Sequence, residues 1–365
     1  MSFGTTHTPR SRWLHFFAVF TWLWALAVIS IGGLVTSKGV GMSVPDWPTT
    51  YGYNMFFFPI RLWEGGIFHE HVHRLVASVL GMLTLILAVW IWISESRNWI
   101  KWLGGIAATL VVGQGVLGGL RVQLNSYDVL GLPGSIFFGV LHATTAQLFL
   151  CLVGVIAWVT RPSWSPNVLG SAVWTGDRKA LWAAALTCMT LLQLMVAASM
   201  RHQHAGLAIP DFPLAYGHLY PPTDAAFLES VNQRRIDVID GGVVTAFQVH
   251  LQMVHRGVAL ALVSLALLLA FRARSESSGW KLVFRGWAGL FLAQFCLGAA
   301  TIWTNKAADV ATAHVALGAI TLSFGVLATF SRSVLEQQGM LRLRSCPQAG
   351  TFLQSAAVSV TGPTA

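Results

Sequence analysis

Long apolar stretches separated by short polar segments dominate the sequence. A helix that crosses the hydrocarbon of a bilayer needs about 20 mostly apolar residues, and eight windows meet that requirement. These windows are 13–36, 71–94, 102–122, 135–159, 180–200, 250–271, 282–303 and 309–330. The pattern predicts an all-α integral membrane protein with eight transmembrane helices. Two connections, 37–70 and 201–249, are much longer than the others and should carry structure of their own.

The composition of the 365 residues agrees with lipid as the main solvent. Hydrophobic residues make up 55% and charged residues only 10%, whereas a soluble domain carries about 25% charged residues. The basic residues lie between the apolar runs and form no patch on a soluble face, so the net charge of +9 does not indicate nucleic-acid binding.

The distribution of charge predicts how the chain is oriented. With a cytoplasmic N-terminus, fourteen of the 23 Lys and Arg residues but only four of the fourteen acids fall on the cytoplasmic side. The positive-inside rule then places both termini in the cytoplasm. The first window is too long for a cleaved signal peptide, and the short basic N-terminus lacks the pattern of a mitochondrial presequence. We therefore expect a prokaryotic plasma membrane protein, with residues 336–365 as a disordered cytoplasmic tail.

An internal repeat divides the chain into two halves, 1–165 and 166–335. Residues 41–52 match residues 206–217 at six of twelve positions. Three further echoes follow in the same order in each half: His73-Arg74 with His255-Arg256, Gln114 with Gln294, and His142 with His314. Because each half has four spans, the chain enters both halves from the same side of the membrane. The sequence thus predicts two parallel-repeat four-helix bundles and disfavours an inverted repeat.

Four histidines lie within predicted spans, close to their outer ends: His73, His142, His255 and His314. An ionisable side chain at that depth is costly and requires a partner, a cavity or a ligand. Two facing imidazoles on neighbouring helices can fill both axial positions of a haem iron. The duplicated pair favours haem ligation over isolated hydrogen bonds between helices. Zinc is the alternative metal, but it usually needs a compact set of four ligands, and no such cluster accompanies His142 or His314.

Both histidine pairs have an arginine neighbour, but only the first has an acidic one. Arg74 and Arg256 each follow a histidine, where a guanidinium could pair with a haem propionate or simply anchor the helix at the interface. Glu70 precedes His73 by three residues, whereas the matching residue of the second half is Gln252. Only the carboxylate can exchange protons. We therefore expect the reaction centre in the first half and a permanent cofactor in the second.

Taken together, these features resemble the haem A synthase family, the membrane enzymes that convert haem O to haem A for terminal oxidases. The resemblance covers nearly the whole chain. It rests on the eight spans, the two Gly-x-x-x-Pro-Asp-aromatic-Pro loops, and the residues Glu70, His73, Arg74, His142, His255, Arg256 and His314.

The resemblance implies a haem-dependent oxidoreductase that hydroxylates the C8 methyl group of haem O twice, after which loss of water leaves a formyl group. It implies that His255 and His314 hold a haem b cofactor. His73 and His142 would bracket the substrate haem O, with Glu70 essential to the chemistry. Haem O synthase and the cytochrome oxidase assembly machinery are the implied partners, the electron donor is not identified, and a homo-oligomer stays open.

The chain departs from some members of the family in its outer loops. Those members carry cysteine pairs there, but no cysteine occurs in 37–70 or 201–249. We expect prolines and aromatic residues to stiffen the loops instead, and the loops to cap the haem pockets.

Two other functions are compatible with four membrane histidines. One is a quinol-linked electron carrier that keeps haem b at both sites, and the other is a transfer or assembly protein that passes haem O on unaltered. The presence of Glu70 where the second half has Gln252 favours the synthase over the carrier, because an electron carrier has no need of a carboxylate at only one haem.

Overall fold

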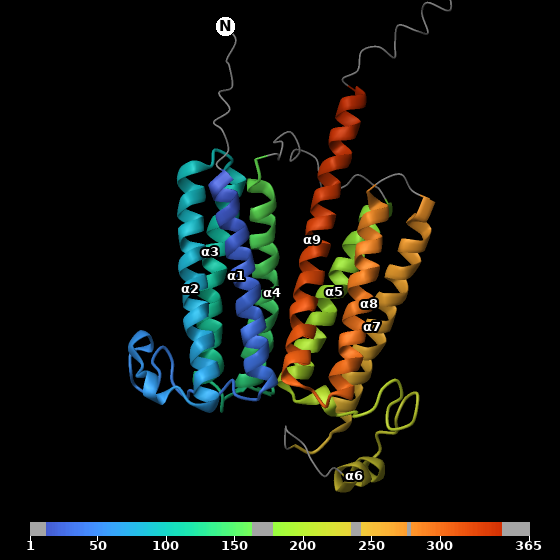
Figure 1. Cartoon of the computed structure of the whole chain (residues 1–365). Helices are drawn as coiled ribbons and strands as arrows, with labels where there is room; N and C mark the ends of the chain where they lie inside the picture. The colour runs from blue at the N-terminus through green and yellow to red at the C-terminus, as the bar shows by residue number, and fades with distance from the viewer. Residues whose placement is uncertain (1–11, 163–177, 235–241, 276–278, 345–365) are drawn as a thin grey trace, which may run out of the picture.

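The computed structural model describes residues 12–162, 178–234, 242–275 and 279–344, and it is built almost entirely of long helices (Figure 1). Within those residues, eight helices are long and apolar enough to cross a membrane, which confirms the predicted all-α membrane class. They are α1 (Arg12–Ser37), α2 (Gly65–Ser94), α3 (Asn98–Gln123), α4 (Gly134–Thr160), α5 (Arg178–His202), α7 (Ala246–Arg272), α8 (Trp280–Trp303) and α9 (Ala308–Arg344). Helix α9 continues past residue 335, where we expected the tail to begin, and the last residues of that tail lie outside the described part.

The long helices pack as two groups of four that stand side by side (Figure 1). In the first group, α1 and α3 each contact both α2 and α4, so the four helices form a closed ring. In the second group, α5 and α8 each contact both α7 and α9. The groups meet where α9 packs on α1 and α4, and where α4 packs on α5.

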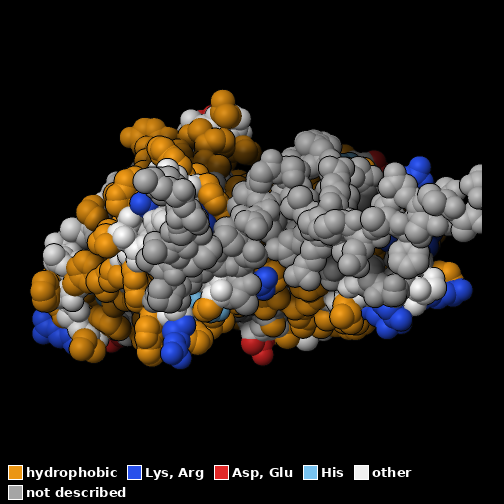
Figure 2. Space-filling view, turned by 90° about the horizontal axis from the view of Figure 1, so that it is seen from above, with side chains coloured by type: hydrophobic (Ala, Val, Ile, Leu, Met, Phe, Trp, Pro, Cys, Tyr) orange, Lys and Arg blue, Asp and Glu red, His pale blue; other side chains and the backbone are white. Residues whose placement is uncertain are grey.

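Both long loops lie at one end of the bundle, which we call the loop end, and the N-terminal end of α1 lies at the other (Figure 1). Seen from above, the end of the bundle opposite the loops shows Lys and Arg side chains beside hydrophobic ones (Figure 2). Charge at the ends of apolar helices is expected of a protein that spans a membrane.

Each group has its own packed interior. Leu87, Ile91 and Ile100 of α2 and α3 are buried against Leu150 and Ile156 of α4 in the first group. In the second group, Trp280, Phe284 and Trp287 stack along one side of α8, with successive ring centroids 5.6 and 6.3 Å apart. Lipid tails are as apolar as these side chains, so close packing rather than exclusion of water stabilises such helix contacts.

The long loops carry short elements of their own. These are η1 (Met55–Phe57) and η2 (Ile60–Leu62) in the first loop, and η3 (Ala205–Leu207) and α6 (Ala225–Arg234) in the second. A small hairpin of β1 (Asp128–Val129) and β2 (Leu132–Pro133) joins α3 to α4 at the same end.

An aspartate organises the repeated motif in each loop. The carboxylate of Asp46 accepts hydrogen bonds from the backbone N–H groups of Tyr51 and Gly52, at 2.7 and 2.8 Å. Asp211 accepts the equivalent bonds from Tyr216 and Gly217, at 2.6 and 3.0 Å. We expected prolines and aromatic residues to stiffen the loops. The aspartates also contribute, because their carboxylates fold each motif back on itself.

Candidate functional site

The four predicted histidines lie in two pairs at the loop end. His255 of α7 and His314 of α9 have ring centroids 6.5 Å apart. A metal binds imidazole nitrogen at about 2 Å, so two rings on opposite sides of one ion have centroids roughly 6 Å apart. The observed spacing therefore fits a single ion between the rings. His73 of α2 lies close enough to His142 of α4 for the two to interact electrostatically.

Glycines on neighbouring helices make room for three of the imidazoles. A Cβ atom at Gly32 of α1 would approach Cε1 of His73 to 2.9 Å. A Cβ atom at Gly298 of α8 would lie 3.2 Å from Cε1 of His314, and one at Gly118 of α3 would lie 3.6 Å from that of His142. The glycines thus form a cradle, that is, they leave space beside the imidazole rings that a side chain at any of these positions would partly occupy.

Glutamines hold three of the histidines in place. Gln193 of α5 donates to the backbone oxygen of His255 at 2.9 Å, and its Nε2 lies 3.0 Å from the Nδ1 atom of that histidine. Gln294 donates to the backbone oxygen of His314 at 2.9 Å. The amide of Gln114, turned so that both of its ends are satisfied, donates to the backbone oxygen of His142 at 3.2 Å.

Unlike these three histidines, His73 has no glutamine hydrogen-bonded to it among the described residues. Its Nδ1 atom is buried and has no hydrogen-bond partner among the described residues, as is also true of Nδ1 of His314. A metal-binding histidine normally donates its second ring N–H to a neighbour, which fixes the ring. Orphaned nitrogens of this kind suit rings whose final orientation is set by a ligand.

Glu70 is buried at the junction of α2 and the first loop. Its carboxylate accepts a hydrogen bond from the backbone N–H of Val44 at 2.9 Å and forms an ion pair with Arg74 at 2.8 Å. Gln252 occupies the matching position and accepts from the backbone N–H of Ile209 at 2.7 Å. Both side chains accept from a loop backbone N–H, but Glu70 adds the ion pair with Arg74, whereas Gln252 donates to backbone oxygens of its loop.

The two predicted arginines clamp the loops to the site helices. Arg74 donates to the backbone oxygens of Asp46 and Thr49, at 2.7 and 3.1 Å. Arg256 donates to the backbone oxygen of Asp211 at 2.7 Å, and its guanidinium lies 5.5 Å from the ring centre of Phe212. Pairing of these arginines with haem propionates stays a prediction.

Three further polar residues reach the site, although we did not predict them as site residues. Arg121 lies near the end of α3, where it interacts electrostatically with His142. Arg201 and His202 end α5, and the His202 ring packs on α4, where a Cβ atom at Gly139 would come within 2.7 Å of it. His202 falls within 201–249, which the sequence predicts to be an outer loop. The sequence did contain a signal for the arginines, because basic residues on the side of the long loops depart from the positive-inside pattern.

The donor set suits haem better than a bare metal ion. Among the described residues, no group of three or more His, Cys, Asp or Glu side chains could hold an ion by itself. A porphyrin supplies four equatorial nitrogens and needs only axial ligands from the protein. Two imidazoles, orphaned ring nitrogens and glycine cradles therefore fit this cofactor class.

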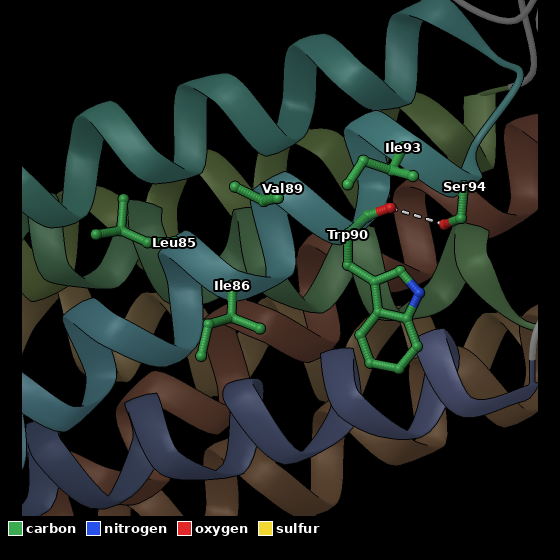
Figure 3. A pocket seen from close by; sticks show the side chains of 6 residues that line it. All are labelled: Leu85, Ile86, Val89, Trp90, Ile93 and Ser94. Carbon is green, nitrogen blue, oxygen red and sulfur yellow. Dashed lines mark hydrogen bonds between the residues drawn. The ribbon is translucent and has the colours of Figure 1, made fainter.

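An apolar hollow on α2 lies away from these residues (Figure 3). It is lined by Leu85, Ile86, Val89, Trp90, Ile93 and Ser94. The hydroxyl of Ser94 donates to the backbone oxygen of Trp90 at 2.7 Å, so the hydroxyl of the lining is engaged by its own helix. The hollow lies toward the other end of α2 from His73, and lipid tails are its natural contents.

Comparison with known proteins identifies the family. The family model described as cytochrome oxidase assembly protein, COX15-CtaA, matches residues 15–326. The chain belongs to this family. The resemblance seen in the sequence is thereby confirmed, and the motif residues Glu70, His73, His142, His255 and His314 all lie within the matched segment.

Several curated relatives carry the name heme A synthase. The one from Methylobacterium sp. (strain 4-46) is 28% identical over 355 residues, which covers 84% of this chain and 89% of the relative. The one from Lysinibacillus sphaericus (strain C3-41) is 25% identical over 324 residues, covering 87% and 94%. The one from Geobacillus kaustophilus (strain HTA426) is 28% identical over 324 residues, covering 87% and 90%.

Proposed function

We propose that this protein is a haem A synthase that oxidises the C8 methyl group of haem O to a formyl group through two hydroxylations and loss of water. The observation that carries the proposal is the pairing of histidines at one end of both helix groups, with a buried carboxylate, Glu70, beside only one pair. Membership of a family whose relatives bear this name supports it.

In this proposal the second half retains a haem b cofactor between His255 and His314, whose ring spacing suits one iron. His73 and His142 hold the substrate haem O. The bound haem supplies the redox chemistry, and the protein supplies ligation, orientation and charge.

Glu70 is the proton-handling group of the first half. Its two carboxylate oxygens are held by Val44 and Arg74, so the acid is fixed in position one helical turn from His73. Its carboxylate can accept a proton released as the methyl group is oxidised. Gln252 keeps the loop contact in the second half but cannot accept a proton, as suits a site that holds a cofactor.

The architecture follows from the same proposal. Residues 1–165 and 166–335 form parallel repeats related by an axis near the membrane normal, and both haem sites face the outer side of a prokaryotic plasma membrane, with cytoplasmic termini. The first half receives haem O from a haem O synthase, and the product passes to cytochrome oxidase assembly.

Production of haem A in a host that otherwise lacks it tests the proposal. The full chain is expressed together with a haem O synthase, and the haems are extracted and identified by pyridine haemochrome spectra and mass. We expect haem A, with haem b retained in the purified protein. Haem b at both sites regardless of haem O supply would instead indicate the electron carrier. Folded, haem-loaded protein that releases only haem O would indicate the transfer protein.

A further inference from the structure

Two arginines from different halves lie near one another at the loop end. Arg121 belongs to α3 and Arg201 to α5, and their guanidinium groups are close enough to interact electrostatically. Both lie within helices that are apolar enough to span a membrane. Two like charges in such surroundings are costly unless an anion accompanies them.

The protein itself compensates these charges only in part. Arg201 donates to the backbone oxygen of Gly33 at 2.7 Å and to the hydroxyl of Ser37 at 3.1 Å, both of which are neutral acceptors. The buried Nε atom of Arg121 has no hydrogen-bond partner within the described ranges. Glu70 is close enough to influence Arg121, but its carboxylate already pairs with Arg74.

Each of the two arginines also lies near one of the histidine pairs. Arg121 interacts electrostatically with both His73 and His142, and Arg201 interacts with His314. A porphyrin held by the first pair would therefore have this charge beside it.

Arg121 is not part of the repeated framework. The residue three positions after Gly118 is Arg121, whereas the residue three positions after the matching Gly298 is Thr301, whose hydroxyl donates to its own helix at 2.8 Å. The first half thus has a cation that its partner lacks, just as it has the acid Glu70 where the second half has an amide.

We propose that Arg121 and Arg201 form a carboxylate-binding site between the halves, which takes the propionate groups of the porphyrin bound by His73 and His142. This inference rests on the proposed function. A guanidinium pairs with a carboxylate through two parallel hydrogen bonds, which gives both affinity and orientation. Arg74 and Arg256 are less suited to this role because their donors are engaged by loop backbone oxygens.

A comparison of two porphyrins tests the site without reference to turnover. Protein that retains its second-half haem is titrated with iron protoporphyrin IX and with its dimethyl ester, in which both propionates are neutral, and binding is followed by the Soret band. We expect wild type to prefer the free acid by roughly tenfold or more, since hydrogen bonds to charged groups are worth that much. Arg121→Gln and Arg201→Gln should each lower this preference.

Two further variants make the result decisive. Arg201→Lys keeps the charge and should retain part of the preference even if the contact with α1 is weakened. Arg61→Gln, at an exposed arginine of η2, should leave the preference unchanged. An unaltered preference in folded Arg121→Gln protein, or its absence in wild type, would overturn the inference. Absence of any porphyrin binding beyond the retained haem would count instead against the proposed function.

Discussion

Gln193 holds His255 from another helix, through a 2.9 Å hydrogen bond to its backbone oxygen and a 3.0 Å contact with its Nδ1 atom. His73, the matching histidine of the first half, has a buried Nδ1 with no partner in the described structure. One ring is therefore oriented by the protein and the other is not. In the proposed function, the ring held by Gln193 belongs to the retained cofactor and the unheld His73 ring to the exchangeable substrate.

Replacing Gln193 with leucine should weaken retention of the second-half haem. Loss of a group that orients a metal ligand typically costs 10- to 100-fold in affinity, and we expect about that increase in the rate at which haem transfers to an apoprotein acceptor. Gln233→Leu, which removes an exposed glutamine of α6, is the control. Equal transfer rates in both variants would show that Gln193 does not position His255.

Replacing Glu70 with glutamine should abolish most haem A formation while the protein still folds. Gln252 makes the same kind of contact with loop backbone, so an amide can hold the structure at this position. Loss of a general acid or base lowers rates by about 10²- to 10⁴-fold. Haem A in extracts measures the effect, and second-half haem content reports folding. Gln252→Glu is the reciprocal change, and full turnover in Glu70→Gln would show that the carboxylate has no role in proton transfer.

Adding a methyl group at Gly298 should disturb His314. The new Cβ atom would lie 3.2 Å from the ring, which is closer than ordinary van der Waals contact. We expect Gly298→Ala to shift the optical spectrum of the retained haem and to lower its occupancy. Gly289 of the same helix offers the matched control, because a Cβ atom there meets nothing within 4 Å. A normal spectrum in Gly298→Ala would mean that the ring has room to move.

The first loop should loosen at acidic pH. Burial acts to raise the pKa of Asp46, but hydrogen bonds from Gly52, Thr49 and Tyr51 outweigh it and hold that pKa below its ordinary value of 3.8. A carboxyl group with a lowered pKa in the folded state stabilises that state above its unfolded pKa, and the stabilisation is lost as pH falls through the folded value. The protection factors of the loop amides, that is, the slowing of their exchange relative to an unstructured peptide at the same pH, should therefore fall below about pH 4. Asp46→Asn should show faster exchange at neutral pH and little further change on acidification.

The spans were predictable because apolar length is a property of the sequence alone. All eight windows correspond to helices, and the repeat located four histidines that the fold brings together in two pairs. The Glu70–Arg74 ion pair joins residues four apart on one helix. We did not predict this pair, because we expected Arg74 to meet a haem propionate or to anchor the helix at the interface.

Contacts made across the bundle were not predictable in the same way. Gln193 has no counterpart in the repeat, because the residue at the same distance before the first loop motif is Val28. The repeat therefore did not mark Gln193 as a site residue. His202 looked like a loop residue until α5 was found to extend to it, and only the packing of α5 on α4 brings its ring against Gly139.

The hydrogen bond from Arg201 to Gly33 links the two halves of the protein. Gly33 adjoins Gly32, against which His73 rests, so a side chain of the second half helps to fix the wall behind His73. The first four helices expressed alone would lack this support. The environment of His73 is therefore shared property of both helix groups, and α5 cannot be altered at Arg201 without consequences for α1.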